Sequence, residues 1–184
     1  MGRSAKKRSR AVVASWLVTV LGLGCLAGCA RMGADPVTSV SHPDWAMKKS
    51  QRLAANELWK AHDGAAGMYI ERGCVSETMT DLSHRDRPWV IRCSVFELRT
   101  SEGARLLYDY YHDGVEKEVQ GIEPLGEATY LWRSPDLSAW IVGFWKGKYF
   151  VEASLAEKGA PGGQPDDSSK QALLDFARRL AAKL

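Results

Sequence analysis

Two histidines stand beside carboxylates at spacings that could do chemistry. His62 is followed by Asp63, and a carboxylate can orient an imidazole for general acid–base catalysis. His112 is followed by Asp113 and lies about one helical turn after Asp109, a spacing that could hold a divalent ion. No nucleophile is identifiable for the first set and no predictable third ligand for the second. We therefore favour a hydrogen-bonding role for Asp63 and a surface position for His112, without a metal site.

A third histidine lies in a motif known from protein kinases. His84-Arg85-Asp86 has the letters of the kinase catalytic loop, but the glycine-rich loop, strand lysine and DFG motif that complete that chemistry do not accompany it. The polar run at 83–88 ends in proline and is typical of a turn. We expect a solvated hairpin turn here.

The first thirty residues have the composition of an export signal. Residues 1–10 contain five basic residues and no acidic one, and residues 11–30 contain no charged residue. A basic start, an apolar stretch and small residues at its end are typical of a secretory signal peptide. The apolar stretch is about as long as a membrane span, so an uncleaved anchor is the alternative. The small residues at 22–28 favour cleavage.

The end of this leader, Leu26-Ala27-Gly28-Cys29, resembles the lipobox of bacterial lipoproteins. The resemblance implies that Cys29 carries a diacylglyceryl group with acyl chains such as palmitate and becomes the new N-terminus, which ties the protein to a membrane. Ala30 follows Cys29, and in Gram-negative lipoproteins this permits sorting to the outer membrane. Cys25 fits the pattern poorly. An ordinary signal peptide that contains cysteines is the alternative.

Removal of the leader changes the charge of the protein. The whole chain has 25 basic and 22 acidic residues, a net charge of +3. The leader holds five of the basic residues and no acidic one, so 20 basic and 22 acidic residues remain, a net charge of −2. The basic excess therefore belongs to the leader and does not indicate nucleic-acid binding. We expect no nucleic-acid partner and no cofactor.

Two cysteines remain after the leader, Cys74 and Cys93. Outside the cytoplasm an even pair indicates a disulfide. The stretches that contain them, 74–82 and 88–98, have the composition of strands, and a polar turn separates them. A hairpin centred near residues 83–84 would place the two cysteines opposite each other. We predict a structural disulfide, with two free thiols or a redox pair as the alternative.

The rest of the chain predicts a single α+β domain. Residues 29–42 are small and polar and predict a flexible tether, and residues 43–184 are long enough for one core. The order of elements favours an antiparallel sheet with helices packed on one face. In chain order we expect a helix at 54–73, strands at 74–82 and 88–98, a helix at 101–114, strands at 127–133, 139–145 and 149–155, and a helix at 170–184.

The segment 62–74, HDGAAGMYIERGC, resembles the signature helix of an uncharacterised family of exported bacterial proteins, a domain-of-unknown-function family. Residues 58–59 and 144–153 also look similar to that family. The sequence departs from the family pattern at Gly67, where a long polar residue is expected, and at Cys74, where an aromatic residue is expected. The resemblance implies an envelope or secreted α+β domain and supplies no catalytic residue.

Aromatic residues are dense toward the C-terminal hairpin and predict either a ligand groove or, as we favour, core positions and an edge against a partner. They are Trp132, Trp140, Phe144, Trp145, Tyr149 and Phe150. Because no coherent catalytic set is found, we expect a lipid-anchored, non-catalytic binding or accessory module of the cell envelope. Its expected partners are the membrane and an envelope protein or apolar ligand. The alternative is a hydrolase-like envelope enzyme that uses His62 and Asp63 or the region of His112.

Overall fold

A computed structural model describes residues 36, 37, 39, 40, 43–158 and 165–184, which belong to one compact unit at 33–184. The predicted signal peptide at 1–28 and Cys29 lie outside the described residues. In chain order the elements are β1 (Trp45–Ala54), α1 (Trp59–His62), α2 (Ala66–Glu71), β2 (Cys74–His84), β3 (Trp89–Leu98), α3 (Ser101–His112), β4 (Ala128–Ser134), β5 (Ala139–Lys146), β6 (Tyr149–Glu157) and α4 (Asp167–Ala181). The predicted α+β class is confirmed.

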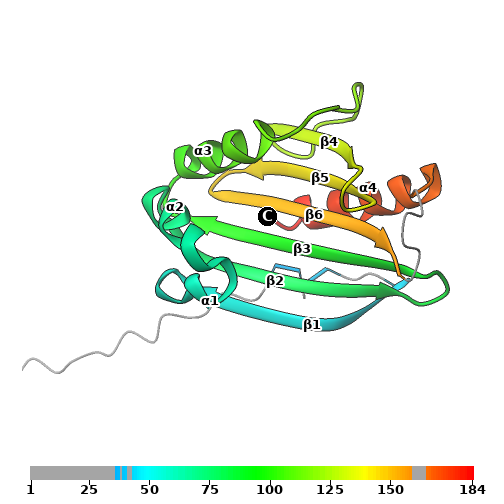
Figure 1. Ribbon diagram of the computed structural model, residues 1–184, viewed down its shortest axis with the longest axis horizontal. Helices are drawn as coiled ribbons and strands as arrows, with labels where there is room; N and C mark the ends of the chain where they lie inside the picture. Colours follow the sequence, from blue (N-terminus) through cyan, green and yellow to red (C-terminus); the bar gives the residue numbers. More distant parts are fainter. Residues whose placement is uncertain (1–35, 38, 41–42, 159–164) are drawn as a thin grey trace, which may run out of the picture. The chain divides into compact units, whose positions relative to one another are not determined.

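The strands form one antiparallel sheet in the order β1-β2-β3-β6-β5-β4 (Figure 1). Its centre joins two distant parts of the chain, because β3 pairs with β6 from Trp89 opposite Glu157 to Glu97 opposite Tyr149. Neighbouring residues of these strands point into different cores, as Phe150 and Val151 do. Strands that are apolar on both faces belong in the interior of a sheet, and β5 occupies such a position as predicted.

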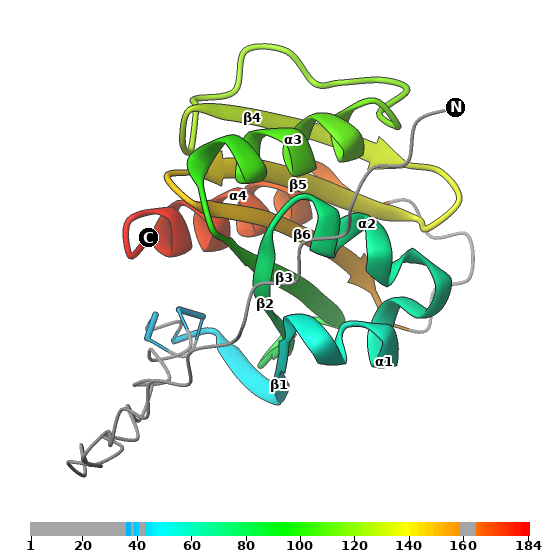
Figure 2. The same cartoon turned by 90° about the vertical axis from the view of Figure 1, so that its left-hand side faces the viewer.

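Helices cover both faces of the sheet, which corrects the prediction of helices on one face. We call the two faces the α4 face and the α3 face. On the α4 face, the apolar stripe of α4 packs against Ile91, Val151 and Leu155. On the α3 face, α2 and α3 pack against Phe96 and Phe150. Figure 1 shows α1, α2 and α3 gathered at one end of the sheet, away from the β2–β3 turn, and Figure 2 shows α2 and α3 from that end.

The predicted helix at 54–73 is broken into short pieces. A 3-10 turn at Ala55–Glu57, α1, a second 3-10 turn at Asp63–Ala65 and α2 follow one another. The break lies at Asp63, whose φ of 43° is outside the helical region. The expected end is confirmed, because Gly73 has a φ of 81° and supplies the left-handed residue after the helix.

The first hairpin has a different register from the predicted one. Its strands reach His84 and begin again at Trp89, so the centre of the turn lies three residues further along than the predicted centre at 83–84. Cys74 is paired with Leu98, and Cys93 with Thr80. The cysteines also face opposite cores, and six residues of strand separate Cys74 from Thr80, about 20 Å. Since a disulfide requires Cα atoms within about 7 Å, the predicted Cys74–Cys93 bond is wrong, and neither residue is in a disulfide.

The N-terminal part of the domain holds two further differences. Strand β1, which the sequence did not predict, pairs with β2 along its length and contains a bulge between Met47 and Lys49. Val37 is only 1% exposed and packs in the core of the α4 face. Val37 therefore belongs to the core, although the sequence analysis places it in the tether predicted at 29–42.

The C-terminal hairpin and helix agree with the predictions. Lys146 is paired with Tyr149, so the connection is the two residues Gly147 and Lys148. Gly147 has the positive φ that this turn needs, 55°. The stripe of α4 is buried at Leu173, Phe176, Ala177, Leu180 and Ala181. Across the part of the chain that the structure describes, no helix combines the length and apolarity needed to cross a membrane.

One glycine allows a side chain to cross a neighbouring strand. Gly143 of β5 lies between Tyr130 of β4 and Glu152 of β6. A Cβ atom at Gly143 would lie 2.1 Å from Cζ of Tyr130, so the tyrosine ring passes directly over the glycine. This approach lets the Tyr130 hydroxyl donate a 2.7 Å hydrogen bond to Glu152 Oε2.

We predict that Gly143→Ala lowers the free energy of unfolding by about 3 kcal/mol, because the new methyl group meets a fully buried ring that has no free space. Urea denaturation measures the change. Gly67→Ala is the matched control: nothing lies within 4 Å of its added Cβ, and alanine in a helix is more stable by about 0.5–1 kcal/mol. A loss of less than about 1 kcal/mol at position 143 would contradict the tight crossing.

Candidate functional site

The α3 face of the sheet divides into a covered end and an open end. At the covered end, α1, α2 and α3 enclose a set of titratable side chains that meet in pairs: His62 with Glu77, Tyr69 with Tyr111, and Tyr130 with Glu152. At the open end, residues of β3, β5 and β6 border a hollow. The two ends differ in what they can do and are considered in turn.

The carboxylate that contacts His62 in the structure is not that of the neighbouring Asp63. Its Nε2 lies 2.5 Å from Oε2 of Glu77, which comes from β2 and has no exposed side-chain surface. Asp63 is exposed. Glu77 stands between Leu53 and Phe96 on the neighbouring strands, and its Oε1 has no hydrogen-bond partner. The pair therefore holds the α1 segment against an otherwise apolar row. The acid–base pair of His62 with Asp63, which was the alternative that we did not favour, is not formed.

Two tyrosines join α2 to α3 above the same row. The hydroxyls of Tyr69 and Tyr111 share a 2.7 Å hydrogen bond. The Tyr69 ring stacks on Phe96 with centroids 5.2 Å apart, and Tyr111 contacts Phe150 at 5.0 Å. Burial is the main cause that raises the pKa of both phenols. Both stay protonated at neutral pH and act as hydrogen-bonding core residues.

The Tyr130–Glu152 pair lies next to this cluster, where the helix cover ends. Burial raises the pKa of the Glu152 carboxyl above its ordinary value of 4.5, and the hydrogen bond from Tyr130 acts in the opposite direction. Burial, followed by the nearby charge of Glu152, raises the pKa of Tyr130. A carboxyl group whose pKa is raised by burial is a frequent feature of functional sites, but here its hydrogen bond is made to a fully buried tyrosine.

His112, which we considered as a metal ligand together with Asp109 and Asp113, has other partners in the structure. Its ring stacks on Tyr108 and Tyr130, and its Nε2 lies 3.4 Å from Glu118 Oε2. Asp109 instead accepts a hydrogen bond from Arg105. Among the described residues, no group of three or more His, Cys, Asp or Glu side chains could hold a metal ion.

His84 organises the turn between β2 and β3, in agreement with the interpretation of the kinase-like letters as a turn. Its Nδ1 accepts hydrogen bonds from the backbone N–H groups of Asp86 and Arg87, at 3.1 and 3.2 Å. Its ring contacts the rings of Trp45 and Trp89 edge-on. These bonds give His84 a structural role in the turn.

The open end of the α3 face holds a hollow of about 290 Å³, which we call the groove. Its floor crosses three strands, because Val90, Ala156 and Ala139 are paired in one row. The neighbouring row begins with Arg92 and Ser154. The residues that line the groove are Val90, Arg92, Leu137, Ala139, Ser154, Ala156, Glu157 and Lys158.

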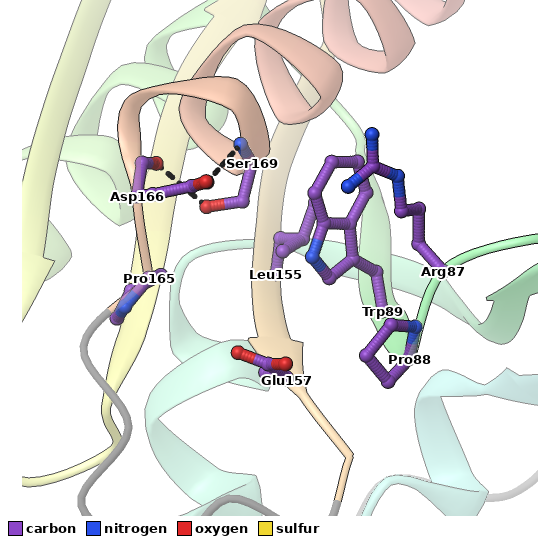
Figure 3. Close-up of a pocket in the computed structure, with 8 residues that line it drawn as sticks. All are labelled: Arg87, Pro88, Trp89, Leu155, Glu157, Pro165, Asp166 and Ser169. Atoms are coloured by element: carbon purple, nitrogen blue, oxygen red, sulfur yellow. Dashed lines mark hydrogen bonds between the residues drawn. The ribbon is translucent and has the colours of Figure 1, made fainter.

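A second hollow of about 190 Å³, the Trp89 pocket, lies between the start of β3 and the start of α4 (Figure 3). Three of its polar side chains, those of Asp166, Ser169 and Arg87, already have partners. Asp166 accepts a 2.8 Å hydrogen bond from the backbone of Ser169 and so caps α4. The guanidinium of Arg87 lies 5.4 Å from the centre of the Trp89 ring. These contacts stabilise turn and helix ends, and they make this pocket a weaker candidate than the groove.

Several site residues escaped the sequence analysis. Glu77 and Glu152 are single carboxylates within strands, and nothing nearby in the sequence names their partners, 15 and 22 residues away. Arg92 alternates with apolar residues in the same way as any exposed strand residue. Glu77 does stand on the same strand face as Met79, which could have marked it as facing a core.

Cys74, which is not in a disulfide, is a buried thiol of low reactivity, because burial raises its pKa to about 12.

Comparisons with known proteins add little to this geometry. No family model matches the chain, and no curated protein matches it, so the expected family membership has no support here. Among solved structures, the chain is similar to the extracellular domain of PknH from Mycobacterium tuberculosis. The TM-score is 0.47 and the identity 12%, over 80% of this chain and 87% of that chain. We draw nothing about ligand, partner or activity from a likeness at this level.

We predict that His62→Ala lowers the free energy of unfolding by about 3 kcal/mol, because both oxygens of the buried Glu77 carboxylate then lack a partner. Urea denaturation measures the loss, and the double variant with Glu77→Leu should recover most of it. Lys60→Ala is the control, since its ion pair with Glu57 is exposed and contributes no more than about 0.5 kcal/mol. Equal losses in the single and double variants would exclude the buried-charge explanation.

We also predict that stability depends on pH through Glu152. Its folded-state pKa lies above the unfolded value, so its stabilising contribution is complete at low pH and is lost as pH rises through the folded-state pKa. Glu152→Gln removes this titration, and the variant should therefore gain stability relative to wild type as the pH rises above the ordinary carboxyl pKa of 4.5. Glu116→Gln, at an exposed position, serves as control. A Glu152→Gln profile parallel to that of wild type would refute this dependence.

Proposed function

We propose that this protein is a lipid-anchored, extracytoplasmic binding module without catalytic activity, and that the groove on the α3 face is its contact surface. The observation that carries the proposal is the uncovered end of that face. Three adjacent strands present small apolar side chains there, Val90, Ala139 and Ala156, and the hollow they form has the size of the smaller ligand sites.

The arrangement of the titratable residues supports a non-catalytic role. His62 is engaged with Glu77, Tyr69 with Tyr111 and Tyr130 with Glu152. A catalytic acid or base must reach the reacting group of a substrate. The three pairs instead join helix to strand, helix to helix and strand to strand, which is a stabilising arrangement. The hydrolase-like alternative has also lost its His62–Asp63 pair.

The proposed anchor supports a position close to the membrane. If Cys29 carries the acyl chains, only residues 30–36 connect it to Val37, which is already buried in the domain. Eight residue steps extend over at most about 29 Å. The binding module is therefore proposed to work near the bilayer, and the expected outer-membrane position for a Gram-negative cell belongs to the same proposal.

We expect acyl-chain labelling of the protein in cells, and loss of the label in Cys29→Ala. In the labelled protein, a photo-crosslinking residue at Ser154, within the groove, should give a discrete adduct with an envelope component. The same residue at Arg179, exposed on α4, is the matched control and should give no such adduct.

Two outcomes would count against different parts of the proposal. Absence of acyl label in wild type would exclude the anchor. Adducts of the same pattern from positions 154 and 179, or none from position 154, would exclude the groove as the contact surface.

A further inference from the structure

We propose that the groove binds an acyl chain with a carboxylate head group. This inference rests on the proposed function, because it takes the groove as the contact surface, and it adds the chemical class of the ligand. Three features carry it: an apolar floor, a cationic rim, and strands whose backbone groups are already paired.

The floor is shaped for a slender apolar occupant. Val90, Ala156 and Ala139 are paired across β3, β6 and β5, and their small side chains leave space above the sheet. Leu137, 63% exposed in the β4–β5 connection, stands beside this row. An exposed leucine next to a hollow with an apolar floor gains stability when a hydrocarbon chain covers it.

The second row limits the length of the groove across the sheet. Ser154 is paired with Ile141, and Ile141 with Trp132 on β4. Trp132 is half-buried at this edge of the α3 core. Ile141 is only 5% exposed and does not line the groove, so in this row the groove ends at Ser154.

The charges at the rim favour an anion. Arg92 has 82% of its side-chain surface exposed, and its Nε lies 3.8 Å from Asp81 Oδ1, too far for a hydrogen bond. Lys158 lines the same rim and is exposed. Glu157 also borders the groove, but it is paired with Trp89 of the opposite face, and Figure 3 shows its side chain in the Trp89 pocket. The rim of the groove is therefore cationic.

The modest positive charge around Arg92 favours a singly charged head group on the ligand. Asp81 is close enough to Arg92 to reduce the local positive field, and it would repel a doubly charged phosphate more than a singly charged carboxylate. A guanidinium group also matches the two oxygens of a carboxylate. A carboxylate is accordingly the head group that fits best.

The paired backbone favours an acyl chain over a peptide. β3, β6 and β5 are interior strands, each hydrogen-bonded to a neighbour on both sides. An extended peptide recognised through its main chain needs an unpaired strand edge, and the floor of the groove presents none. An acyl chain has no hydrogen-bonding groups to satisfy and needs none from the floor.

The test is photo-labelling of the full chain in vesicles of phosphatidylcholine, with a ten-carbon fatty acid that carries a diazirine at its methyl end. Mass spectrometry of peptides locates the adducts, which we expect in β3, β5 and β6. Arg92→Glu should lower labelling of these peptides by about tenfold, the effect of losing one charge-assisted hydrogen bond. Arg179→Glu makes the same charge change on the other face and should leave labelling unchanged.

A second variant guards against an indirect effect of charge. Ala156→Trp fills the floor without changing any charge and should abolish labelling, while circular dichroism checks that the fold is kept. Unchanged labelling in Arg92→Glu, or adducts concentrated on α4, would overturn the proposal. If the fatty acid fails while the crosslinker at Ser154 still gives its adduct, the ligand class is wrong and the binding function stands.

Discussion

The burial of both faces of β3, β5 and β6 is the constraint on which the rest of the structure depends. Adjacent residues such as Phe150 and Val151 point into separate cores, and each is fully buried. Apolar side chains on both faces must be removed from water on both sides. Helix α4 therefore has to lie on one face and α2 with α3 on the other, whatever the loops between them contain.

The cover on the two faces is unequal, and this inequality creates the candidate site. Helix α4 is the longest helix of the described residues, with an apolar stripe from Leu173 to Ala181. On the other face α1 and α2 are short, and only α3 is longer than ten residues. The short helices reach one end of the sheet. The other end keeps small side chains and one exposed arginine, so a groove is left where a helix would otherwise pack.

The buried polar groups of the covered end secure this arrangement. Each buried carboxylate has a partner from a different element: His62 for Glu77, and Tyr130 for Glu152. A partner of this kind offsets much of the cost of placing a carboxylate among apolar residues, and its loss is expensive. The His62–Glu77 contact holds α1 against the sheet, the Tyr130–Glu152 contact joins β4 to β6, and both lie apart from the residues of the groove. Stability and binding are thus carried by different side chains of one face.

Local sequence patterns determined a large part of the fold. The alternation in β6, the stripe of α4, the turn at Gly147 and the helix end at Gly73 depend on residues within a few positions of one another, and the structure agrees with each. Local patterns did not predict where the helical segment at 54–73 is interrupted. The apolar spacing across 54–73 favours one helix, but the chain breaks at Asp63, which has a φ of 43°.

Only the tertiary structure decided the pairings between distant residues. Strand composition predicted that 74–82 and 88–98 are extended, but it does not set their register. In the structure Cys93 lies opposite Thr80 instead of Cys74. The meeting of β3 with β6, the choice of Glu77 over Asp63 for His62, and the row of Val90, Ala156 and Ala139 all join residues remote in sequence. The sequence by itself states which residues avoid water and which are charged. Which of them meet depends on how the whole sheet and its two helical layers bury their apolar faces together.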